Sequence, residues 1–194
     1  MLGVGAAFAL GLGAVLFLWH GSRSSISETD SFTAPGLEPL TISAAQESFW
    51  QLTPALLLEV YKAFGKTNEG EIYDTLASVT DGEALEYLYL ERIGALAGGG
   101  LDEADQTIHE IRLVNTVVER DDAVLRFDAT WQVIGTVGHA EHLHVRGNTY
   151  SADLVVAPIA GAWRITGFTL RDVNRDSAGE TFLAPGVDAS AGTN

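Results

Sequence analysis

Apolar and polar side chains alternate along residues 123–137, and this pattern constrains the fold more than any other part of the sequence. The apolar set is Ala123, Leu125, Phe127, Ala129, Trp131, Val133 and Val137. Because successive side chains of a β-strand point to opposite faces of a sheet, an alternation of this length predicts a strand with one face on a core and the other in water.

Three further strands are predicted beside it, over residues 108–119, 140–157 and 162–171. They are separated by turn signals, an Arg-Asp-Asp run at 120–122 and Pro158 with Gly161. In the last strand Trp163 and Phe168 fall out of phase across Gly167, which predicts a bulge at that glycine. Short connections of this kind indicate an antiparallel meander.

Three helix-like segments precede the strands. Thr53 and Pro54 have the residue types of a helix start, Asn68 resembles a second cap, and Thr80 a third. The tyrosines in these segments are interpreted as core packing, namely Tyr61, Tyr73, Tyr87 and Tyr89. Helices followed by a meander predict an α+β fold, with about three N-terminal helices packed on a curved antiparallel sheet of about four strands.

Residues 2–19 contain no charged or strongly polar side chain, which predicts a single membrane-spanning helix within residues 1–20. A signal peptide is a weaker interpretation because no basic stretch precedes the run and no convincing cleavage site comes after it. A buried core helix would need a larger protein around it. The run could also belong to a longer membrane protein.

Two opposing arguments bear on the side of the membrane where the domain lies. Arg23 is the nearby basic residue, and counting it would place the domain in the cytoplasm. A lone N-terminal anchor commonly exports the domain attached to it, so we expect an extracytoplasmic domain. Residues 21–45, rich in Ser, Thr, Gly and Pro, are predicted to form a flexible tether, residues 46–174 the domain, and residues 175–194 a disordered tail.

The composition excludes several classes of function. The chain has 11 Lys and Arg against 26 Asp and Glu, a formal net charge of −15, and such a surface repels nucleic-acid phosphates. It has no cysteine, which excludes disulfides, thiolate metal sites and a cysteine nucleophile. No G-x-S-x-G elbow, P-loop or G-x-G-x-x-G after a strand is present, so no catalytic residue is assigned.

The third strand carries the side chains with most chemical promise. A regular strand would place its even-numbered polar residues on one face, as a ligand-orienting group inside a cleft. With the tryptophan of the neighbouring strand, the candidate ligand-binding residues are His142, His144, Arg146, Asn148, Tyr150 and Trp131. A bulge at Gly147 would reverse the phase and leave His142, His144 and Arg146 in solvent.

The histidines between residues 138 and 144 also form a candidate metal site. His139, His142 and His144 could bind Zn, Cu or Ni, with Glu141 or His109 as further ligands. The spacing matches no recognised motif, and clustered histidines are more often surface or hydrogen-bonding groups. Unless such a metal is bound, no cofactor is expected.

The order of three helices and four strands, ending in Gly-Ala-Trp-Arg-Ile at residues 161–165, resembles the nuclear transport factor 2 superfamily. The resemblance covers about residues 53–171 and implies a cone-shaped α+β domain. It also implies a wide choice of function, because members include ketosteroid isomerase-like and dehydratase-like enzymes and many non-catalytic modules, some of them tethered to membranes. No catalytic residue carries over by position.

Three functions remain open. The first is a membrane-tethered, non-catalytic binding or assembly module that docks a protein partner, a further copy of the chain or a small ligand through its sheet face or cone. The second is a small-molecule or metal-binding domain built on the third strand. The third is a lyase or isomerase with a histidine base. An inward-facing His142 and His144 would favour the second and third.

Overall fold

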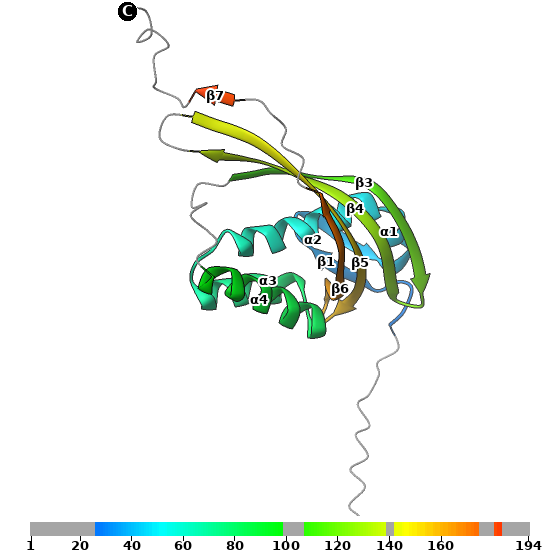
Figure 1. The fold of residues 1–194 in the computed structure, drawn as a ribbon. Coiled ribbons are helices and arrows are strands. Elements are labelled where there is room, and N and C mark those ends of the chain that lie inside the picture. Colours follow the sequence, from blue (N-terminus) through cyan, green and yellow to red (C-terminus); the bar gives the residue numbers. More distant parts are fainter. Residues whose placement is uncertain (1–25, 99–106, 139–141, 175–180, 184–194) are drawn as a thin grey trace, which may run out of the picture.

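The computed structural model describes residues 26–98, 107–138, 142–174 and 181–183 of the chain (Figure 1). The helices are α1 (Ile42–Glu47), α2 (Phe49–Phe64), α3 (Glu69–Val79) and α4 (Gly82–Ala97). The strands are β1 (Ser31–Ala34), β2 (Leu37–Thr41), β3 (Thr107–Asp121), β4 (Val124–Gly138), β5 (His142–Ile159), β6 (Ala162–Asn174) and β7 (Thr181–Leu183).

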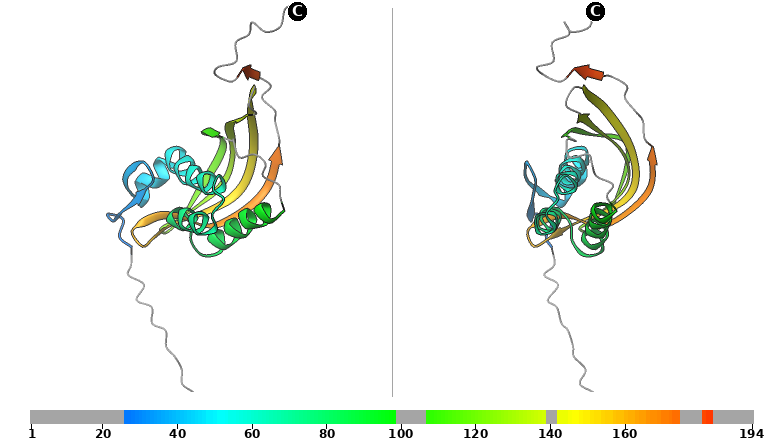
Figure 2. Two further views of the ribbon diagram at one scale, coloured as in Figure 1. Left: turned by 90° about the vertical axis from the view of Figure 1, so that its left-hand side faces the viewer. Right: turned by 60° about the vertical axis from the view of Figure 1, so that its left-hand side comes forward.

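The strands form one curved sheet in the order β2-β1-β6-β5-β4-β3. The long strands β3 to β6 pair antiparallel with their neighbours in sequence, whereas β1 pairs parallel with β6. β7 pairs with the first residues of β5. Figures 1 and 2 show the sheet bending over the helices, so the helical layer lies on its concave side.

The core fills the space between the concave face and the helices. The apolar positions of the alternation from Leu125 to Val133 are buried, and the largest of them, Trp131 and Phe127, are 1% and 2% exposed. α2 and α3 add buried residues at helical spacing, namely Leu52, Leu56, Leu57, Val60, Ile72 and Leu76. Their burial against the sheet is what stabilises helices of this length, since isolated short helices are marginal in water.

The prediction of four strands on three helices is wrong. The four expected strands correspond to β3–β6, but β1, β2, β7 and the helix α1 are added. β1 and β2 are only 4 and 5 residues long, too short to show a period in the sequence. The chain turns between them at Gly36, whose φ is +68°. Tertiary contacts hold them: the Trp163 indole N–H donates to the Leu40 carbonyl over 3.1 Å.

Two predicted helix starts are also wrong. α2 begins at Phe49 and carries Pro54 inside it. Thr80 closes α3 instead of opening α4, because its hydroxyl donates to the Leu76 carbonyl at 2.7 Å. The predicted cap at Asn68 is confirmed, since its side-chain oxygen accepts from the Glu71 backbone N–H.

Within the described residues, no helix is long and apolar enough to cross a membrane. The predicted span at residues 2–19 lies outside them, as does most of the predicted tail at residues 175–194.

A bulge in β6 changes which side chains reach the concave face. Val156 pairs with Ile165, but Val155 pairs with Gly167, so Thr166 is the additional residue. The bulge lies next to Gly167, where the sequence predicted it. It turns Phe168 to the concave face, the same face as Trp163. Bulges increase the local bend of a strand, in keeping with the curvature seen here.

We predict that Gly167→Ala destabilises the domain. A Cβ at Gly167 would lie 2.9 Å from Cγ2 of Val155, and this β-branched side chain cannot turn away freely. The free energy of unfolding should fall by about 1–3 kcal/mol, as measured by chemical denaturation.

Gly94→Ala is the matched control, because a Cβ at Gly94 in α4 meets nothing within 4 Å. It should leave the free energy of unfolding unchanged or raise it by up to about 1 kcal/mol. Equal effects of the two substitutions would contradict the close approach of β6 to Val155.

Candidate functional site

An aromatic cluster lies on the concave face, built by two helices and three strands. Its members are Tyr61 and Phe64 of α2, Tyr87 of α4, Trp131 of β4, Tyr150 of β5 and Phe168 of β6. We refer to these six residues as the aromatic cluster. Trp131 is buried, whereas Tyr61, Phe64, Tyr150 and Phe168 are half-buried and Tyr87 is 41% exposed, so the cluster reaches from the core to the surface.

The rings form a continuous series of contacts. Trp131 stacks on Tyr150 with ring centroids 5.8 Å apart and planes 16° apart. The ring centroids of Tyr150 and Tyr61 are 5.9 Å apart, and those of Phe168 and Trp131 are 6.4 Å apart. Tyr87 stacks on Phe168 at 5.8 Å. Offset-stacked and edge-on rings of this kind stabilise one another beyond their buried area.

Strand register places the centre of the cluster. Trp131 and Tyr150 are directly opposed in the β4–β5 ladder, and opposed residues share a face. Phe168 reaches that face because of the additional residue in β6. Tyr61 comes from α2, which packs across the concave side.

Neutral hydrogen-bonding groups accompany the rings. The Trp131 indole N–H donates to the Tyr61 hydroxyl over 3.0 Å, and the Asn148 amide N–H donates to the Tyr150 hydroxyl over 3.4 Å. Burial, and secondarily the nearby phenol of Tyr150, raises the pKa of Tyr61 above its ordinary value. The site therefore offers uncharged groups that can orient a ligand, and Tyr61 is no base at neutral pH.

Three of the predicted site residues, Trp131, Asn148 and Tyr150, lie together in this way. Tyr61 was missed as a site residue, because in the sequence it is one apolar position in a helical stripe. Only the helix-to-sheet packing shows that its hydroxyl meets the Trp131 indole. No local sequence signal identifies that contact.

The side chains of His142, His144 and Arg146 lie outside the described part of the structure, and their predicted place in the site stays a prediction. The β4–β5 pairing itself is continuous from Leu125 with Val156 to Gly138 with Leu143. The alternative with a bulge at Gly147 is therefore wrong for this ladder, in which Gly147 pairs with Ile134.

The metal site also stays a prediction. His139 and Glu141 lie outside the described residues, and so do the side chains of His142 and His144. His109 is exposed on β3. Among the described residues, no group of three His, Asp or Glu side chains is placed to hold a metal ion.

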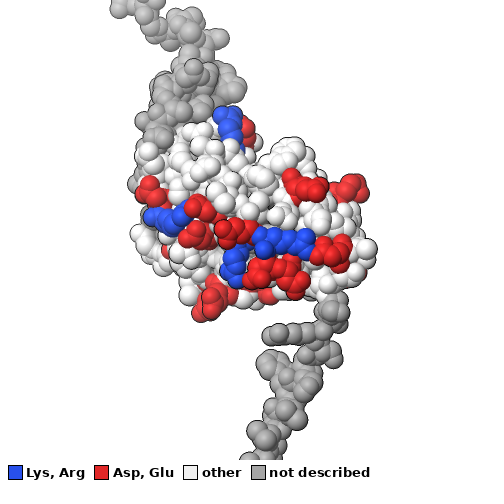
Figure 3. Space-filling view, turned by 90° about the vertical axis from the view of Figure 1, so that its right-hand side faces the viewer, with Lys and Arg blue, Asp and Glu red and all other residues white. Residues whose placement is uncertain are grey.

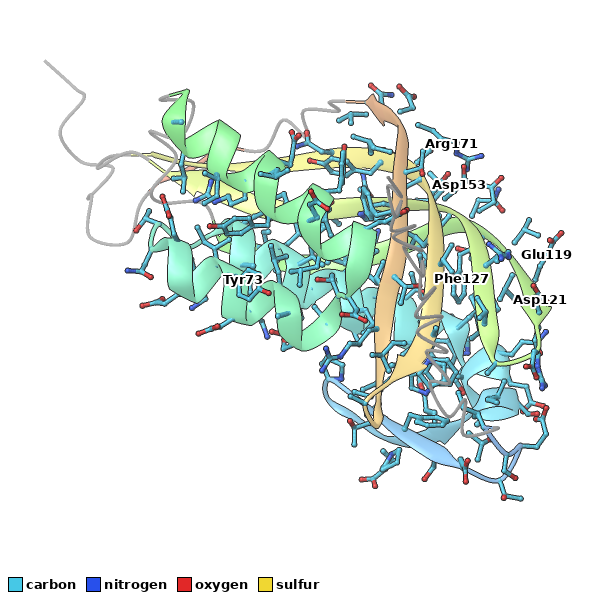
Figure 4. All side chains as sticks on the ribbon, turned by 90° about the horizontal axis from the view of Figure 1, so that it is seen from below. Tyr73, Glu119, Asp121, Phe127, Asp153 and Arg171 are labelled. Carbon is cyan, nitrogen blue, oxygen red and sulfur yellow. The ribbon has the colours of Figure 1, made fainter. Side chains whose placement is uncertain are left out.

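The convex face of the sheet has the opposite character. Asp128 and Asp153 are opposed in the β4–β5 ladder, and Arg171 of β6 pairs with both, its Nη1 lying 3.1 Å and 3.4 Å from their carboxylate oxygens. The hydrogen bond from Arg171 lowers the pKa of the Asp128 carboxyl. Figure 3 shows acidic and basic side chains interleaved, and in Figure 4 Asp153 and Arg171 project away from the helices.

A hollow of about 330 Å³ lies elsewhere in the domain, where β1 and β6 meet α2 and α3. It is lined by Thr33, Ala34, Pro35, Glu59, Ser78, Val79, Ala162 and Trp163. Its carboxylate, Glu59, is engaged by Lys62 at 2.6 Å, and this hollow lacks the converging aromatic and polar groups of the concave face.

Comparison with known proteins places the chain in no family, since no family model and no curated protein matches it. Among solved structures, the crystal structure of the intermembrane-space region of the chloroplast protein ARC6 is similar, with a TM-score of 0.41 and 20% identity over 68% of this chain and 96% of that chain. A de novo designed β-sheet protein, solved by NMR, is also similar, with a TM-score of 0.32 and 14% identity over 71% of this chain and 95% of that chain. Both scores are low, and neither likeness carries an argument about function.

We predict that Tyr61→Phe changes the response of the domain to alkali. Tyrosine in an unfolded chain loses its proton near about pH 10, whereas folded Tyr61 keeps it to higher pH. Above about pH 10 the unfolded state therefore binds fewer protons than the folded state. The free energy of unfolding keeps this contribution below about pH 10 and loses it above, by up to about 1.4 kcal/mol per pH unit. Tyr61→Phe should remove this contribution to the fall.

The measurement is chemical denaturation at about pH 8 and about pH 11. Tyr73→Phe is the control, because Tyr73 is 48% exposed on α3 and its hydroxyl lies outside the site. If Tyr61→Phe and the wild type lose stability equally between the two pH values, the Tyr61 hydroxyl is not buried as described.

Proposed function

We propose that the protein is a membrane-tethered, non-catalytic binding module of the nuclear transport factor 2 type, which receives an uncharged aromatic or hydroxyl-bearing group on its concave face. The apolar run at residues 2–19 supplies the tether, and we place the domain on the extracytoplasmic side. The bound group belongs to a small ligand or to a side chain of a partner protein.

The observation that carries this proposal is the network of Tyr61, Trp131, Asn148 and Tyr150 at a half-buried end of the core. Apolar walls with a few oriented polar groups are what ligand sites usually consist of. Here the polar groups are an indole, an amide and two phenols, and burial keeps Tyr61 neutral. Such a set suits an uncharged partner better than an ion.

The surroundings of the cluster support binding at this end. Phe64 at the C-terminal end of α2, and Ile93 and Leu96 near the C-terminal end of α4, are half-buried against the core. In Figure 2 the ends of β4 and β5 that lie near β7 rise past the helices. The helices therefore do not cover the concave face over the full length of these two strands.

The convex face fits a docking site less well. Its Asp128, Asp153 and Arg171 satisfy one another and are solvated, so an apolar partner placed over them would have to desolvate their charges, which is costly. The sequence left two docking surfaces open, the outer sheet face and the cone. The chemistry of the described residues favours the cone, whose inner surface is the concave face.

We predict that the full chain in lipid nanodiscs binds 4-ethylphenol, an uncharged probe, as detected by saturation-transfer NMR. Tyr150→Phe removes the hydroxyl and keeps the ring, and Asn148→Leu removes the amide and keeps the volume. Each should weaken binding about tenfold, the effect of one lost hydrogen bond.

Tyr73→Phe again serves as the control and should bind as the wild type does, because Tyr73 is 48% exposed and its ring packs on Tyr89 of α4 rather than on the aromatic cluster. Unchanged affinity in both Tyr150→Phe and Asn148→Leu would contradict binding on the concave face.

A further inference from the structure

β3 is a long strand with one unpaired edge. Within the described residues this 15-residue strand stands at the end of the strand order and pairs only with β4. Among the described residues, no backbone hydrogen bond joins β3 to an element other than β4. Such an edge presents unpaired N–H and C=O groups, which proteins usually blunt or cover.

The side chains on this edge are unusual for a solvated strand. Val114 is 62% exposed and Val117 is 54% exposed, among the most exposed large apolar residues described. On either side of them lie one cation and one anion, Arg112 and Glu119, both exposed. Glu119 forms no ion pair within the described part of the chain, whereas Arg112 is bridged by Glu110 of its own strand at 2.9 Å.

We propose that β3 pairs antiparallel with β3 of a second copy of this chain, on a two-fold axis through Thr116. A symmetric dimer of this kind must place each residue opposite one that faces the same side of the sheet. A regular strand centred on Thr116 would pair Arg112 with Arg120, which faces the core side. The bulge at Val114 changes this count.

The β3–β4 ladder shows the bulge directly, because Leu113 pairs with Trp131 while Asn115 pairs with Thr130. We count outward from Thr116 and pass over Val114, the additional residue. In this alignment Asn115 faces Val117 of the second copy, Leu113 faces its Val118, and Arg112 faces its Glu119.

The members of each pair face the same side of the sheet, and the two outer pairs also match in chemistry. Leu113 and Val118 both point to the concave side, opposite Trp131 and Phe127 of β4, and both are half-buried. Arg112 and Glu119 both point to the convex side, opposite Gln132 and Arg126 of β4. By symmetry the charge pair occurs twice, once at each end of the ladder, and opposed opposite charges stabilise neighbouring strands.

The same alignment shows where the pairing stops. The next outward-facing pair would bring Glu110 against Asp121 of the second copy, two like charges. Arg120 at that end is already engaged by Glu28 and by the Ser43 hydroxyl. The ladder is therefore limited to the stretch between Arg112 and Glu119. Because both copies use the same edge, the assembly closes at two copies.

The test is charge reversal with rescue in the full chain in detergent, with the oligomeric state measured by sedimentation. Arg112→Glu and Glu119→Arg should each raise the dimer dissociation constant roughly tenfold or more, because two attractive pairs become repulsive. The double variant restores opposite charges and should dimerise as the wild type does. Glu86→Arg, an equal charge change on the exposed side of α4, is the control and should have no effect.

A second readout uses the absence of cysteine from the chain. Thr116→Cys would lie opposite its own copy at a Cα separation of about 4.5–5.5 Å, within disulfide reach, and should crosslink on oxidation. Glu119→Cys would lie roughly 20 Å from its copy along the ladder and should not.

Three results would each overturn the proposal: a wild type that remains monomeric, a folded double variant that fails to dimerise, or equal crosslinking of the two cysteine variants. Thermal unfolding of every variant identifies any that fail to fold, and the cysteine pair decides the matter if a charge variant does so. A dimer held only by residues 2–19 would show no response to the charge reversals, which also overturns it.

Discussion

The pairing of Trp131 with Tyr150 across β4 and β5 determines how the rest of the concave face is arranged. Both strands keep an unbroken register on either side of this pair, so the buried row of β4 lies beside that of β5 along the whole core. β6 adds Phe168 to the same row through its bulge, and α2 lays Tyr61 over it. The indole is buried, and because a buried N–H without a partner is costly, the Tyr61 hydroxyl fixes where α2 can cross the sheet.

The alternation of the strands separates two kinds of chemistry. The concave side holds aromatic rings with uncharged donors and acceptors, whereas the convex side holds carboxylates and guanidinium groups in contact with water. A dimer joined through β3 would keep this separation, because a two-fold axis normal to the sheet leaves both concave faces on one side. Two binding sites would then face the same direction, an arrangement suited to a tethered module.

Periodicity and capping predicted the elements that are stabilised locally, and missed those that depend on distant contacts. The alternation in residues 123–137 and the cap at Asn68 were sufficient to place β4 and the start of α3. β1 and β2 are too short to show a period, and Trp163 and Ala162 of β6 hold them. Within the site, Trp131 and Tyr150 can be placed from strand phase. Tyr61 cannot, because its role comes from the packing of a helix on the sheet.

The most direct test of the account is hydrogen exchange of the Trp131 indole N–H, measured by NMR in the full chain and assigned by a Trp131→Phe variant. A hydrogen-bonded indole that is 1% exposed should exchange far more slowly than an indole in water. It should also exchange faster when Tyr61 is replaced by phenylalanine. Exchange at the rate of a solvent-exposed indole would show that α2 does not cover this part of the sheet, and would contradict the concave face as described.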